Sequence, residues 1–160
     1  MENKNKKGRD LLLELERTGQ YVFHGSEDGE IEVFEPRQAF NFIGGKKVED
    51  DKPGVHATPV VAVAIFMALF NGKNCPQGFS SSFVWDKNKH KVIFSATKQG
   101  IDQLKMGDAS GYVYIFDKGL FQWRKHIEYI SYNVAKPIKK IKVDFSDLPE
   151  DIKIISDFGK

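Results

Sequence analysis

The sequence predicts a mixed α+β fold in a single domain, and three observations support this prediction. The chain has 160 residues, which is the usual size of one domain. Two segments have a helical pattern, an amphipathic one at residues 10–17 and an almost wholly apolar one at residues 60–70. Roughly seven short β-rich segments accompany them. Because strands and helices do not alternate along the chain, two small packed sheets are expected rather than a doubly wound parallel sheet.

The N-terminal part is expected to hold a tail, a helix and a strand. Residues 1–8 are polar and basic and are expected to be a disordered tail. A group of four leucines follows among charged residues, and Gly19 comes after it as a stop signal, which predicts a short helix. Residues 21–24 are β-rich and run into a turn at residues 25–26.

Residues 31–53 are expected to be mostly irregular. Residues 31–34 alternate apolar with acidic side chains, which predicts one short strand. Residues 41–53 contain two adjacent glycines and a charged run at residues 46–52. This composition predicts a solvated surface loop.

The apolar helix is expected to begin at a strong start signal. A short strand is predicted at residues 53–57. Thr58 then precedes Pro59, an N-cap residue followed by a proline in the first turn. Residues 60–70 are apolar on nearly all sides, as in a buried helix, and residues 71–72 are typical of a helix end.

The second half of the chain is rich in strands. Five β-rich segments are expected to be strands: residues 83–85, 92–94, 112–116, 128–132 and 138–145. The first two flank a short polar turn and predict a hairpin. Pro137 stands at the start of the last strand, where proline costs no ladder hydrogen bond. Residues 120–126 are mixed in character and predict a helical turn or a loop.

Composition excludes several classes of protein. The net charge of +2 is too small to indicate a nucleic-acid-binding protein on charge alone. Cys75 is the single cysteine, so no internal disulfide can form, and a reducing, cytoplasmic location is expected. The longest apolar stretch, residues 59–70, is too short to span a bilayer, and no membrane association is expected. The four histidines have no metal-ligand spacing, so no metal is expected.

Three short segments carry side chains suited to ligand binding. His24 ends a strand, Gly25 leaves the backbone beside it open to a planar ligand, and Ser26 adds a hydroxyl. His56 ends another strand, just before the capped helix. Glu128 lies in an aromatic-rich strand, where a carboxylate that is buried without a partner is costly.

Each segment also has a simpler explanation when it is taken alone. His24 is then a partly exposed histidine at a strand end, before a common turn. His56 is a histidine whose ring is satisfied by a backbone carbonyl. Alternation places Glu128 on one face of its strand with Ile130 and Tyr132, and that carboxylate could lie at a solvated edge.

Taken together and in this order, the three segments resemble the ADP-ribosyltransferase superfamily, in the branch that includes the poly(ADP-ribose) polymerases and diphtheria toxin. That branch has a histidine in an H-G-S or H-G-T segment, a tyrosine in a strand before a helix, and a glutamate in a later strand that often reads E-Y-I-V-Y. The matches are HGS at residues 24–26, His56 at the tyrosine position, and EYISY at residues 128–132. The resemblance covers residues 20–143. It implies split β-sheets with an N-terminal helix and one buried central helix.

The resemblance also implies a reaction. ADP-ribose would pass from NAD, as substrate, to an unknown acceptor, either a protein, a nucleic acid or a small molecule, with release of nicotinamide. His24 would hydrogen-bond a ribose hydroxyl, and the backbone of Gly25, supported by Ser26, would pair with the nicotinamide carboxamide. His56 would line or stack on the nicotinamide. Glu128 would bind the 2′-hydroxyl of the nicotinamide ribose and carry catalysis, and no metal is required.

Several alternatives stay open at this point. His56 stands in place of the family's stacking tyrosine, and an imidazole is smaller and can be charged near neutral pH. Tyr112 or Tyr114 could supply the stacking ring instead. Arg37 either reaches an NAD phosphate or is a surface arginine. A catalytically inactive module that binds NAD, ADP-ribose or a partner chain is the alternative to an enzyme. A relative of the RNA 2′-phosphotransferases would rely on arginines, of which the chain has only four.

Overall fold

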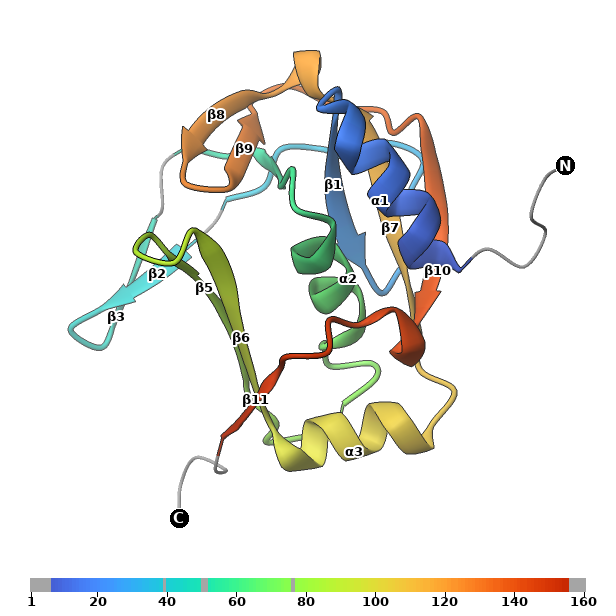
Figure 1. Cartoon of the computed structure of the whole chain (residues 1–160). Helices are drawn as coiled ribbons and strands as arrows, with labels where there is room; N and C mark the ends of the chain where they lie inside the picture. The colour runs from blue at the N-terminus through green and yellow to red at the C-terminus, as the bar shows by residue number, and fades with distance from the viewer. Residues whose placement is uncertain (1–6, 39, 50–51, 76, 156–160) are drawn as a thin grey trace, which may run out of the picture.

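The computed structural model describes residues 7–38, 40–49, 52–75 and 77–155 (Figure 1). Within these residues the fold contains three α-helices and four small sheets, so the expected α+β class is confirmed. The helices are α1 (Gly8–Thr18), α2 (Val61–Leu69) and α3 (Lys98–Met106). The strands are β1 (Tyr21–Ser26), β2 (Phe40–Ile43), β3 (Lys46–Glu49), β4 (Val55–Ala57), β5 (Ser81–Asp86), β6 (Lys91–Thr97), β7 (Ser110–Asp117), β8 (Gln122–Lys125), β9 (Glu128–Ser131), β10 (Lys139–Asp144) and β11 (Lys153–Ile155).

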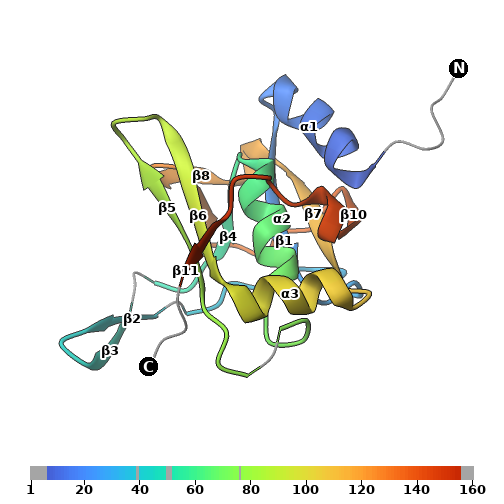
Figure 2. The same cartoon turned by 60° about the horizontal axis from the view of Figure 1, so that its bottom comes forward.

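The described strands form more sheets than the two that were expected. The strand orders are β1-β7-β10, β4-β9-β8, β11-β6-β5 and β2-β3. Neighbouring strands are antiparallel, except that β11 runs parallel to β6. Helix α2 lies between the β1-β7-β10 sheet and the β5–β6 hairpin (Figures 1 and 2). Only Ala62 and Met67 of α2 are not buried, which confirms the expected buried central helix.

Helix α1 confirms the expected N-terminal helix. It begins at Gly8, so the tail is shorter than expected, and residues 1–6 lie outside the described residues. Gly19 ends the helix with a left-handed φ of 69°, which glycine adopts without steric cost. Leu12 is fully buried and joins the hydrophobic core around α2.

The start of α2 differs from the expectation in one respect. The helix begins at Val61, and its N-cap residue, Val60, makes no side-chain capping hydrogen bond. The hydroxyl of Thr58 accepts the N–H of Val60 at 3.2 Å, outside the helix. The N–H of Val61 instead donates to a carboxylate oxygen of Glu16 at 2.6 Å. Because Glu16 belongs to α1, the cap comes from a neighbouring helix, and local sequence carries no signal for it.

Most of the region expected to be a loop, residues 41–49, belongs to a hairpin. Residues 52 and 53 are irregular as expected, and residues 50 and 51 lie outside the described part. Gly44 and Gly45 make the turn between β2 and β3 with φ of 59° and 80°, a backbone that adjacent glycines favour. Strand β3 is exposed throughout, so its charged side chains are solvated as expected. Residues 31–34, by contrast, form no strand, and Phe34 makes only an isolated bridge.

Three elements in the second half were not predicted. Helix α3 carries Gly100 in its first turn and ends before Gly107, and such glycines argue against a helix when only the sequence is considered. Strand β11 has three residues, and it is held by a parallel partner far along the chain. Strand β8 occupies most of residues 120–126, after a 3₁₀ turn at Lys118–Leu120.

None of the helices in the described residues combines the length and the apolar character needed to cross a membrane.

Candidate active site

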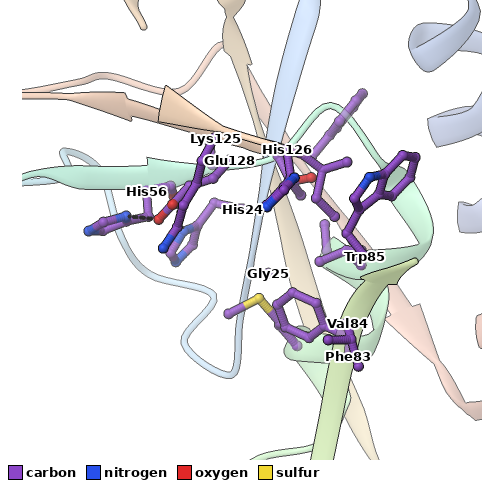
Figure 3. A pocket seen from close by; sticks show the side chains of 16 residues that line it. His24, Gly25, His56, Phe83, Val84, Trp85, Lys125, His126 and Glu128 are labelled. Atoms are coloured by element: carbon purple, nitrogen blue, oxygen red, sulfur yellow. Dashed lines mark hydrogen bonds and ion pairs between the residues drawn. The ribbon is translucent and has the colours of Figure 1, made fainter. Parts of the chain in front are cut away.

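A cavity of about 530 Å³ lies where five parts of the fold meet. Its walls come from the ends of β1 and β4, from one side of α2, from β5, and from the turn between β8 and β9 (Figure 3). The lining residues are Phe23, His24, Gly25, His56, Ala57, Thr58, Val63, Ala64, Met67, Phe83, Val84, Trp85, Lys125, His126, Ile127 and Glu128. The volume lies within the range of small-molecule sites. Four residues singled out from the sequence therefore line one cavity.

The cavity opens where β1 and β4 separate. Phe23 and Thr58 form an isolated antiparallel bridge with reciprocal backbone hydrogen bonds of 2.7 and 2.9 Å. If this ladder continued, the next hydrogen-bonded pair would be Gly25 with His56, two residues further along each strand. It does not continue, because the carbonyl oxygen of His56 is bonded at 2.8 Å to Nδ1 of His24. The side chain of His24 thus occupies the place of a ladder hydrogen bond.

Gly25 consequently has an open backbone edge. Phe23 turns its N–H and C=O away from β7, toward Thr58. Backbone direction alternates along a strand, so the N–H and C=O of Gly25 point to the same side as those of Phe23, away from β7. Among the described residues no group bonds to them. The absence of a side chain at Gly25 has its own cause, because a Cβ there would lie 1.9 Å from the carbonyl oxygen of Ala64 in α2.

His24 is held in one protonation state and one tautomer. A carbonyl can only accept, so Nδ1 of His24 carries the proton and donates to the oxygen of His56. Burial lowers the pKa of His24, the hydrogen bond to the His56 backbone raises it less, and the charge of Arg37 lowers it slightly. The ring is therefore neutral at pH 7, and its Nε2 is a hydrogen-bond acceptor. Phe34 packs edge-on against it, with ring centroids 4.9 Å apart.

His56 and Glu128 are joined directly across two paired strands. His56 is opposite Ile130 in the β4–β9 register, which makes Glu128 its diagonal neighbour on the same face. Nδ1 of His56 donates to Oε1 of Glu128 at 2.8 Å, as the dashed line in Figure 3 marks. Nε2 of His56 is buried and has no hydrogen-bond partner within the described part of the chain.

Arg124 completes this cluster and was not predicted from the sequence. Its Nη1 donates to both carboxylate oxygens of Glu128, at 3.2 and 3.1 Å. The two side chains are 19% and 25% exposed, so this ion pair is largely shielded from water. No sequence signal singled out Arg124, because β8, which pairs with β9 and brings Arg124 beside Glu128, was not predicted as a strand.

Two predicted site residues are not in the cavity wall. The hydroxyl of Ser26 accepts the N–H of Asp28 at 3.1 Å and fixes the turn after β1. Arg37 has an exposed side chain, and its backbone pairs with Gly54. Arg37 reaches the cavity only through its charge, which contributes to the low pKa of His24.

The suggested tyrosines are also elsewhere. Tyr114 is buried, and its hydroxyl donates to the carbonyl of Asp28 at 2.6 Å. Tyr112 lies beneath the ammonium group of Lys140. The aromatic side chains that line the cavity are those of Phe23, Phe83 and Trp85. The last two belong to the hairpin that the sequence predicted, but nothing in the sequence placed that hairpin opposite His24.

No group of three or more histidine, cysteine, aspartate or glutamate side chains is arranged to hold a metal ion within the described residues. Comparisons of the chain with protein-family models, with curated proteins and with solved structures found no match.

Proposed function

We propose that the protein transfers ADP-ribose from NAD to an acceptor and releases nicotinamide. One observation carries the proposal. Residues from three consecutive segments of the resemblance, His24, His56 and Glu128, meet in one cavity beside the open backbone edge of Gly25. Local sequence does not require this meeting, because the three residues lie on β1, β4 and β9.

The open edge of Gly25 suits the nicotinamide end of NAD. A primary carboxamide has one N–H₂ donor and one C=O acceptor in a plane, as an extended backbone has. The C=O and N–H of Gly25 can therefore pair with it, as a second strand would. The apolar walls, which include Phe23, Ala64 and Trp85, favour a flat aromatic ring over water.

The two polar side chains fit the ribose. Neutral His24 offers Nε2 as an acceptor for a ribose hydroxyl. Glu128 supplies a negative charge on the same wall, and one of its roughly four acceptor positions is left after the hydrogen bonds from His56 and Arg124. That position can accept the 2′-hydroxyl of the nicotinamide ribose.

The chemistry then needs no acid. The bond between C1′ of the ribose and the nicotinamide nitrogen breaks, and nicotinamide leaves as a neutral molecule with the bonding electron pair. Positive charge develops on the ribose, as in glycoside hydrolysis, and the Glu128 carboxylate stabilises it. The acceptor nucleophile forms the new bond to C1′, and its proton passes to Glu128 or to solvent.

One observation favours a second function. The hydrogen bonds from His56 and Arg124 already neutralise and orient Glu128. A carboxylate held in this way stabilises a positive charge less than a free one. A module that binds NAD or ADP-ribose without turning it over is therefore the alternative.

Nicotinamide release from labelled NAD separates the two functions. The wild-type protein is measured with and without cell lysate as a source of acceptor, beside Glu128→Ala. Glu32→Ala, at an exposed position outside the cavity, is the matched control. The transferase requires release that is lost in Glu128→Ala and kept in Glu32→Ala, with NAD still protecting both variants from heat. Protection without release would favour the binding module, and full activity in Glu128→Ala would refute the mechanism.

A further inference from the structure

The ends of two hairpins whose strands line the cavity carry lysines. The β5–β6 turn carries Lys87 and Lys89, Lys91 is the first residue of β6, and Lys125 is the last residue of β8. All four lysines are exposed. Strand β5 and the β8–β9 turn line opposite walls of the same cavity, where Trp85 and Lys125 mark the two sides (Figure 3).

We call these two hairpin ends, with Lys87, Lys89, Lys91 and Lys125, the rim. The basic side chains of the rim outnumber its acidic ones. Asp86 is the single acidic residue at the β5–β6 turn, and its carboxylate is occupied by the N–H groups of Asn88 and Lys89, at 2.9 and 3.2 Å. Arg124 and Glu128 pair with each other, so five cationic side chains stand against two carboxylates. The surplus of three positive charges is more than the +2 of the whole chain. His90 and His126, both exposed, add charge when protonated.

One acidic segment lies outside the cavity lining. Residues 27–35 contain five acidic residues and no basic one. This segment packs against the β1-β7-β10 sheet, where Tyr114 donates to the carbonyl of Asp28 and Lys140 donates to the carbonyl of Gly29.

Aromatic surface lies beside the basic rim. Phe83 is 38% exposed and Trp85 is half-buried, and both line the cavity. His90 lies against Trp85, with ring centroids 6.4 Å apart. Val84 is 59% exposed between them. A tryptophan and a phenylalanine at a wet cavity mouth, flanked by lysines, form a surface on which unpaired bases stack while phosphates meet the ammonium groups.

We propose that this rim binds a single-stranded nucleic acid, so that the acceptor of ADP-ribose is an unpaired nucleotide. The identity of the acceptor rests on the proposed function, whereas the binding of a single strand does not. Single strands are favoured over duplexes because stacking on Trp85 requires a base that is free of its partner. An acidic polypeptide would use the lysines but not the aromatic rings.

Binding is measured by fluorescence anisotropy on the full chain, with labelled oligothymidylate and oligouridylate of about 12 nucleotides. A duplex of the same length and poly-L-glutamate are the comparison ligands. The variant carries Lys87→Gln, Lys89→Gln and Lys91→Gln. Its control carries Lys136→Gln, Lys139→Gln and Lys142→Gln, three exposed lysines outside the cavity lining that give the same change of charge.

The rim variant is expected to bind single strands about tenfold more weakly near 0.1 M salt, with a log–log salt slope lower by about 2. The control variant should lose less than about twofold. Stacking is measured separately in the variant Trp123→Phe, in which Trp85 is the remaining tryptophan. Bound oligonucleotide should quench the fluorescence of Trp85.

The proposal is overturned if wild type does not bind single strands, if both lysine variants lose affinity equally, or if poly-L-glutamate binds as tightly as the oligonucleotide. Unquenched Trp85 fluorescence on a bound complex would also overturn it. If oligonucleotide binds in this way while NAD is never consumed, the transferase fails and the binding site stands. If NAD is consumed without oligonucleotide binding, the rim proposal alone fails.

Discussion

The pair formed by Arg124 and Glu128 should contribute measurably to stability. Nη1 of Arg124 makes two hydrogen bonds to the carboxylate, and both side chains are mostly shielded from water. Exposed ion pairs contribute about 0.2–1 kcal/mol, and hydrogen bonds to charged groups about 1.5–3 kcal/mol. At 19% and 25% exposure the pair lies between these cases. A coupling free energy of about 1–1.5 kcal/mol is therefore expected.

A double-mutant cycle measures this coupling. Arg124→Ala, Glu128→Ala and the double variant are unfolded in urea and followed by tryptophan fluorescence. The pair formed by Lys98 and Asp102 is the control, because it has the same spacing but is 72% and 47% exposed. Its coupling should be the smaller of the two, because solvent screens an exposed ion pair. A coupling for Arg124 and Glu128 no larger than that of the control would mean that burial does not strengthen this pair.

Three further predictions follow from the geometry. Gly25→Ala should lower the free energy of unfolding by about 3 kcal/mol, because a Cβ there would lie 1.9 Å from the Ala64 carbonyl oxygen. Gly19→Ala, which has only a positive φ and no atom within 4 Å of the new Cβ, should lower it by about 1 kcal/mol in the same urea assay. Equal losses would contradict the packing argument. Glu16→Ala should destabilise the fold by about 1 kcal/mol and Thr58→Ala by less, because Glu16 caps α2. A larger loss in Thr58→Ala would support Thr58 as the cap. Because the pKa of His24 is lowered in the folded protein, the unfolded chain binds more protons than the folded one below about pH 6.5. Stability should therefore fall on acidification in that window, and His24→Gln should reduce the fall.

Patterns within single segments predicted much of the fold. The amphipathic stretch became α1, the apolar run became α2, and the segments expected as strands from residue 83 onward became β5, β6, β7, β9 and β10. Several of the errors share one cause, which is dependence on distant partners. Strand β11 needs its parallel neighbour β6, and the cap of α2 comes from α1. The short segment at 31–34 found no neighbouring strand to extend it.

The candidate site was predictable in its residues but not in its contacts. Spacing and residue type singled out His24, Gly25, His56 and Glu128, and these four line one cavity. Ser26 and Arg37 face other surroundings. No sequence pattern indicated that the ring of His24 would replace a ladder hydrogen bond, because that depends on where β4 leaves β1.

In the proposed mechanism the charge of Glu128 drives the release of nicotinamide from NAD. Glu128→Gln keeps the shape of the side chain and removes this charge. The release rate at saturating NAD is expected to fall by about 10²–10³-fold, while NAD affinity changes by no more than a few fold. A variant that keeps more than about a tenth of the wild-type rate would show that the charge is not required.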